Sequence, residues 1–95
     1  MINFQDAVAL AEHELARLAP SDGDAFVLHL EQTIERPFGW VLFWGSELYA
    51  KTGDLQYALA GNSPFIVNRH DATILTTGTA LPVVEYIKQY EANFA

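Results

Sequence analysis

Cysteine is absent from this 95-residue chain, so neither a disulfide framework nor a thiolate metal site can hold it together. Basic residues are few: five stand against twelve acidic ones, and the formal charge of −7 repels phosphate backbones and anionic lipid headgroups. No apolar run reaches the roughly 20 residues that a membrane-spanning helix needs, and the first residues lack the features of a secretory signal. We therefore expect a cytoplasmic protein that binds neither nucleic acid nor membranes.

The residues that usually carry chemistry are also sparse. His13, His29 and His70 each lack a second histidine at the short spacings that would form a metal-ligand pair. Glu31 and Glu35 fall on one side of a predicted strand but about 13 Å apart, too far for a catalytic carboxylate pair. Nucleophile elbows and glycine-rich phosphate loops are likewise missing from the sequence. The sequence thus predicts a protein that is not an enzyme and carries no cofactor and no metal.

Apolar residues, by contrast, are plentiful. They make up 51% of the chain, while charged residues make up 18%, a balance unlike that of disordered proteins. A chain of this length suits one domain with one core. We expect a single domain over residues 1–95.

Both ends of the chain have the apolar spacing of a helix that packs on a core. Asn3 is placed to cap the first helix, and Asp6 puts an acid in its first turn. The apolar stripe of this helix consists of Phe4, Val8, Ala11, Leu15 and Leu18. Pro82 fits the start of the last helix, whose apolar stripe is Val83, Ile87, Tyr90 and Phe94.

The pattern of residues in the middle of the chain predicts β-strands. Residues 25–35 alternate with a period of two, with Phe26, Leu28, Leu30 and Ile34 on one side. Residues 38–44 follow across a short hairpin and are apolar on both faces, which is typical of a central strand. Residues 65–68 and 73–77 form a second hairpin across the turn 69–72.

These elements predict an α+β fold of the order α-β-β-β-β-α. We expect a largely antiparallel, four-stranded sheet with the N- and C-terminal helices packed on one face. The other face would then lack helices. An edge formed by a short strand could also pair with a second copy, which makes a homodimer conceivable.

The segment from Gly45 to Asn62 is long and polar for a connection in so small a domain, and such loops are commonly functional. Within and beside it, acids and aromatic side chains combine as they do at protein interfaces. Trp40 and Trp44 could serve the core or a partner, and the doubly apolar strand favours the core for at least one of them. Gly53 is a candidate for a positive φ angle. The candidate partner-binding residues are Trp44, Glu47, Tyr49, Asp54 and Tyr57.

The order of short motifs resembles the immunity protein 35 family, also called YrhB-like. The motifs are Phe38-Gly39-Trp40, Thr52-Gly53-Asp54, Ala58-Leu59-Ala60-Gly61-Asn62 with Pro64, and Thr77-Gly78-Thr79-Ala80 before the last helix. The ordered set, which covers nearly the whole chain, carries the resemblance. Each motif alone is unspecific.

This resemblance implies a non-catalytic bacterial protein that binds and neutralises a partner toxin encoded beside it, in competition between bacteria. In such a complex, the acidic surface would steer a basic surface of the toxin toward it. The alternative is a chaperone or stress-related protein, an activity also ascribed to YrhB-like members, which would hold unfolded clients on the uncovered sheet face.

Overall fold

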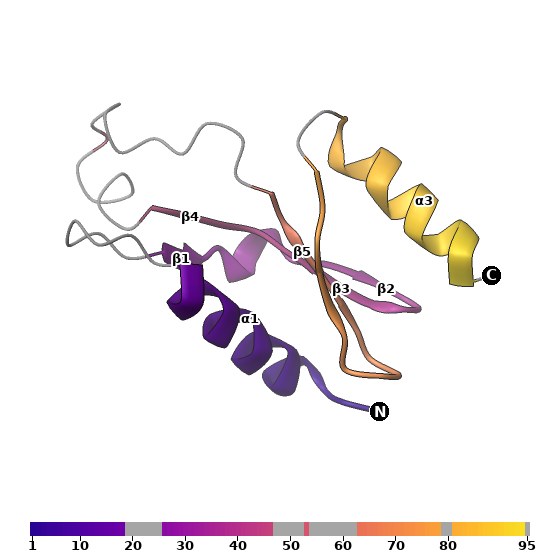
Figure 1. Cartoon of the computed structure of the whole chain (residues 1–95), viewed down its shortest axis with the longest axis horizontal. Coiled ribbons are helices and arrows are strands. Elements are labelled where there is room, and N and C mark those ends of the chain that lie inside the picture. The colour runs from indigo at the N-terminus through magenta and orange to yellow at the C-terminus, as the bar shows by residue number, and fades with distance from the viewer. Residues whose placement is uncertain (19–25, 47–52, 54–62, 79–80, 95) are drawn as a thin grey trace.

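The computed structural model describes residues 1–18, 26–46, 53, 63–78 and 81–94. Its elements are α1 (Phe4–Leu18), β1 (Phe26–Leu28), the short 3₁₀ helix η1 (Leu30–Gln32), β2 (Ile34–Arg36), β3 (Gly39–Leu42), β4 (Trp44–Ser46), β5 (Phe65–Asn68), β6 (Ile74–Thr76) and α3 (Val83–Phe94). Along the chain, one helix precedes the antiparallel strands and another follows them, so the predicted α+β class is confirmed (Figure 1). None of the described helices is long and apolar enough to cross a bilayer.

The predicted cap of α1 is present and is reciprocal. The side-chain Oδ1 of Asn3 accepts the backbone N–H of Asp6 at 2.8 Å, and Oδ2 of Asp6 accepts the N–H of Asn3 at 3.2 Å. Two of the N–H groups that a helix start leaves without partners are satisfied in this way. The cap fixes the point at which the chain enters α1.

The strands form two antiparallel sheets. The larger has the order β2-β3-β5-β6, and the smaller consists of β1 and β4. In the larger sheet Arg36 lies opposite Gly39, so that Pro37 and Phe38 alone close the hairpin between β2 and β3. The sequence predicted one continuous sheet of four strands, whereas the described residues form six short strands in two sheets.

The prediction of an uninterrupted strand over residues 25–35 is wrong, because η1 divides it. Leu28 lies opposite Trp44, and Ile34 lies opposite Val41. The five residues 29–33 therefore stand opposite only two residues, Leu42 and Phe43, an excess of three. The carbonyl of Phe43 accepts the N–H of His29 at 2.8 Å. Since an odd number of extra residues reverses the alternation of side chains, Leu28 and Ile34 project from opposite faces despite their even spacing.

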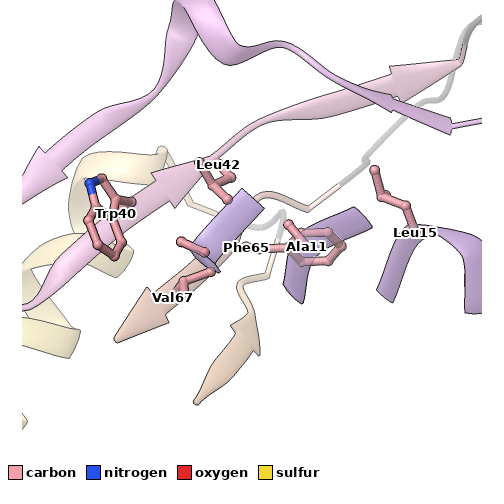
Figure 2. Close-up of a cluster of buried hydrophobic side chains, with 7 residues drawn as sticks. Ala11, Leu15, Trp40, Leu42, Phe65 and Val67 are labelled. Atoms are coloured by element: carbon pink, nitrogen blue, oxygen red, sulfur yellow. The ribbon is translucent and has the colours of Figure 1, made fainter. Parts of the chain in front are cut away.

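The helices cover opposite faces of the sheet, and the prediction that both pack on one face is wrong (Figure 1). On one face Ala11 and Leu15 of α1 meet side chains of β3 and β5, as Figure 2 shows. This first cluster comprises Ala7, Ala11, Leu15, Trp40, Leu42, Phe65 and Val67. The second cluster, on the other face, comprises Phe38, Val41, Ile66 and Ile87 of α3. All residues of β3 and β5 are buried, so both faces of these two strands are covered. Helix α1 covers one face and α3 covers the other.

Gly39 sits where β3 passes very close to β5. Its φ angle is +148°, and a Cβ atom there would lie 1.9 Å from the carbonyl oxygen of Val67. Only glycine fits such an approach. The Phe-Gly-Trp motif therefore has a structural cause in the close packing of the two central strands.

Candidate binding surface

Trp44 is the predicted partner-binding residue that the structure describes, and it lies at the start of β4. Its indole N–H donates to the carbonyl oxygen of Ser63 at 2.6 Å. The ring stacks on Phe65 with 5.8 Å between centroids and 16° between planes, and it meets Phe26 at 4.8 Å. The side chain is half-buried against the first cluster, so its main contacts are within the chain.

These contacts place Trp44 at the base of the polar segment. The chain leaves β4 at Ser46, which is buried, and is described again from Ser63. Trp44 bonds to Ser63 and stacks on the strand that follows it. One side chain thus links the strand that precedes residues 47–62 to the residue that follows them.

The other four predicted contact residues are Glu47, Tyr49, Asp54 and Tyr57, and all of them lie outside the described residues. Gly53, which is described, has a φ angle of +67°, as the sequence predicted. A Cβ atom there would meet nothing within 4 Å. Glycine is therefore needed at this position for its backbone conformation and not for lack of space.

A cluster around Arg69 was not predicted from the sequence. The guanidinium carbon lies 4.7 Å from the centroid of the Trp40 ring. One Nη atom of Arg69 donates to Oε2 of Glu35 and to the carbonyl oxygen of Arg36, each at 2.9 Å. Since Phe4 packs on Trp40 with 5.9 Å between ring centroids, the cluster joins α1, β2, β3 and the turn after β5.

The Arg69 cluster borders an open cavity of about 650 Å³. Its lining residues are Met1, Ile2, Asn3, Phe4, Thr33, Glu35, Trp40 and Arg69. The guanidinium already has a carboxylate partner in Glu35. The arrangement suits a structural role in fixing the N-terminus, whose Ile2 N–H donates to the Arg69 carbonyl at 2.9 Å.

The described cations are largely neutralised within the chain. Arg17 pairs with Glu14, Arg69 with Glu35, and Lys88 with Glu85. The hydrogen bond and charge of Arg17 hold the pKa of the Glu14 carboxyl below its ordinary value. With twelve acids against five cations in the chain, the excess charge presented to a partner is negative.

A second open cavity, of about 450 Å³, lies between α1 and the β1 strand. It is lined mostly by apolar side chains, and Glu12 stands at its side: the set is Glu12, Leu15, Ala16, Phe26, Val27, Leu28 and Leu30. Within the part of the chain that the structure describes, no three His, Asp or Glu side chains gather as a metal site requires. What this part of the molecule offers is apolar and acidic surface.

Two comparisons with known proteins found a match. The model of the family described as Immunity protein 35 matches residues 5–92. The chain is also 37% identical over 97 residues to the uncharacterized protein YrhB of Escherichia coli (strain K12), and the match covers 100% of this chain and 95% of that protein. No solved structure is significantly similar to it.

Proposed function

This chain belongs to the immunity protein 35 family, and we propose that it binds and neutralises a cognate bacterial toxin by forming a stoichiometric complex. The observation that carries the proposal is the family match over residues 5–92, which includes all described strands and nearly all of both helices. Inhibition of this kind needs shape and charge complementarity, and it needs no reactive centre.

The contact surface that we propose is the segment 47–62 together with Trp44 at its base. Glu47 and Asp54 supply acids there, and Tyr49 and Tyr57 supply large side chains that lose little conformational entropy on binding. The hydrogen bond from Trp44 to Ser63 ties the ends of the segment together, which lowers the entropy that binding has to remove.

Charge supports a partner with a basic contact surface. The chain carries a formal charge of −7, and Arg17, Arg69 and Lys88 are already paired with acids of the same chain. Attraction between an acidic and a basic surface raises the association rate most at low ionic strength. A complex of this kind therefore forms more slowly as salt is added.

The test is co-expression with the toxin-domain product of the adjacent reading frame, followed by purification of the complex. We expect an equimolar complex and protection of the cell. Glu47→Lys and Asp54→Lys should each slow association, measured by stopped flow, by about threefold to tenfold at low salt. Glu91→Lys, on α3, is the matched control and should have a smaller effect, since α3 packs on the sheet face opposite to Trp44.

A chaperone function depends on an uncovered, apolar sheet face. Both faces of β3 and β5 are covered, one by α1 and the other by α3. The apolar sheet surface available for holding unfolded clients is therefore smaller than the sequence predicted. Light-scattering assays with several unrelated aggregating proteins separate the two functions, because a general chaperone suppresses aggregation of all of them and an immunity protein of none.

A further inference from the structure

Strand β6 lies at one edge of the four-stranded sheet, with β5 on its inner side. The other edge, β2, carries Glu35 and Arg36 and is followed by Pro37, all of which discourage pairing with another strand. Residues 72–78, around β6, contain neither a charged residue nor a proline. The two edges therefore differ in their protection against a second strand.

The hydrogen-bond pattern shows which backbone groups of β6 point outward. The carbonyl of Thr73 accepts the N–H of Asn68 at 2.9 Å, and the N–H of Thr77 donates to the carbonyl of Pro64 at 3.0 Å. These two residues thus turn their backbone groups toward β5. Because successive residues in an antiparallel strand alternate, Leu75 does the same, while Ile74 and Thr76 point their N–H and C=O groups away from the sheet.

Leu75 supplies an exposed apolar side chain at this edge. It is 52% exposed, although it lies opposite Ile66, which is buried under α3. Beside it a cavity of about 200 Å³ runs between β6 and α3. Its remaining lining is uncharged and consists of Ile66, Thr76, Thr77, Gly78, Tyr86, Gln89, Tyr90 and Asn93.

We propose that β6 pairs with β6 of a second copy of this chain, antiparallel and about a two-fold axis that passes beside Leu75. In this register Ile74 lies opposite Thr76 of the second copy, and each pair exchanges N–H to C=O hydrogen bonds through its outward groups. The two Leu75 residues form the central pair without hydrogen bonds, where side chains approach most closely. The strand is thus complementary to itself in both hydrogen bonding and apolar contact.

The surface charge sets the conditions under which this pairing occurs. Two chains of charge −7 repel each other, but the α3 residues that line the groove beside β6 are the uncharged Tyr86, Gln89, Tyr90 and Asn93. The repulsion is therefore long-range and is screened by salt. Dimerisation should strengthen with ionic strength, whereas association with a basic toxin should slow.

The area available makes the dimer weak. A three-residue strand and one flanking groove fall well short of the roughly 1,200 Å² that stable complexes bury. We expect the monomer to predominate at low micromolar concentration and the dimer to appear at hundreds of micromolar, which corresponds to a free energy of association of about −5 kcal/mol.

Disulfide trapping tests this register directly, because the natural chain has no cysteine. Cα atoms of a central pair without hydrogen bonds lie about 4.5 Å apart, within the range of a disulfide. Leu75→Cys should therefore form a covalent dimer under mild oxidation, at least tenfold faster than the matched control Val84→Cys. Val84 is 43% exposed on α3 but lies outside the lining of the β6 groove.

Sedimentation velocity of the unmodified chain provides the second measurement. We expect a monomer–dimer equilibrium that shifts toward dimer between 50 mM and 500 mM salt, and that Leu75→Lys abolishes while Val84→Lys leaves it intact. A chain that stays monomeric at all concentrations, or equal crosslinking of the two cysteine variants, would overturn the proposal. In that case the edge would be free for a strand of another protein, and the proposed inhibition of a toxin would be unaffected.

Discussion

The indole N–H of Trp44 donates to the carbonyl oxygen of Ser63, 19 positions later in the chain, at 2.6 Å. The bond spans the two ends of a segment that contains four of the five predicted contact residues. The same ring stacks on Phe65 in the core. The base of the proposed binding segment is thereby part of the folded core. We expect that mutations can change the stability of the protein separately from its binding of the toxin.

Trp44→Phe removes the hydrogen bond but keeps an aromatic ring against Phe65. We expect it to lower the free energy of unfolding by about 1 kcal/mol, whereas Trp44→Ala lowers it by about 3 kcal/mol because the ring contacts are lost as well. Urea denaturation followed by circular dichroism measures both. Equal costs for the two variants would show that the hydrogen bond, and not ring packing, dominates.

Gly39→Ala should be among the most damaging single changes. The added Cβ atom would lie 1.9 Å from the Val67 carbonyl oxygen, so β3 and β5 would have to separate, and we expect a loss of at least about 3 kcal/mol. Gly53→Ala is the matched control, because its φ angle of +67° is strained for alanine but its Cβ atom meets no neighbour. It should cost only about 1 kcal/mol. Thermal unfolding of the two variants compares these costs, and similar melting temperatures would refute the close approach at Gly39.

Replacement of Arg69 by lysine should lower the stability of the protein. An ammonium group cannot reproduce both the contact of the guanidinium over the Trp40 ring and the two bonds to Glu35 and to the Arg36 carbonyl, so Arg69→Lys should cost about 1 kcal/mol. Arg17→Lys, in an exposed pair with Glu14, should leave stability nearly unchanged, because solvent screens the pair. Chemical denaturation distinguishes the two, and an equally small effect at Arg69 would mean that its cluster adds nothing to stability.

Asp71 should contribute to stability in a way that depends on pH. The hydroxyl and then the N–H of Thr73 donate to its carboxylate and hold the pKa of Asp71 below the ordinary 3.8. Its contribution is therefore complete above that ordinary value and is lost as the pH falls through the lowered pKa in the folded state. The stability difference between the natural chain and Asp71→Ala should be constant from about pH 5 to pH 7 and should shrink toward pH 3. A difference that grew on acidification would contradict this assignment.

The strong periodic signals of the sequence located the helices and the central strands. The first helix runs to Leu18 as its apolar stripe indicates, and residues 65–68 form the predicted strand without a shift at either end. Such signals are local, because they arise from side-chain spacing within one element.

The placement of the second helix could not be predicted in this way. The alternation of Trp40 and Val41 showed that both faces of β3 are apolar, but it did not say which helix covers which face. The interruption at η1 was hidden because Phe26, Leu28 and Leu30 keep a period of two into a segment that leaves the sheet. The Arg69 cluster joins residues more than 25 positions apart, and no local pattern reveals such contacts.

The central claim is that the chain inhibits its toxin by binding it in equal amounts, and titration of the purified toxin's activity tests this claim most directly. At toxin concentrations well above the dissociation constant, activity should fall linearly with added protein and reach its minimum at one chain per toxin. Loss of activity at amounts far below equivalence would indicate catalytic turnover. That result, or full activity at a large excess of the protein, would contradict the account.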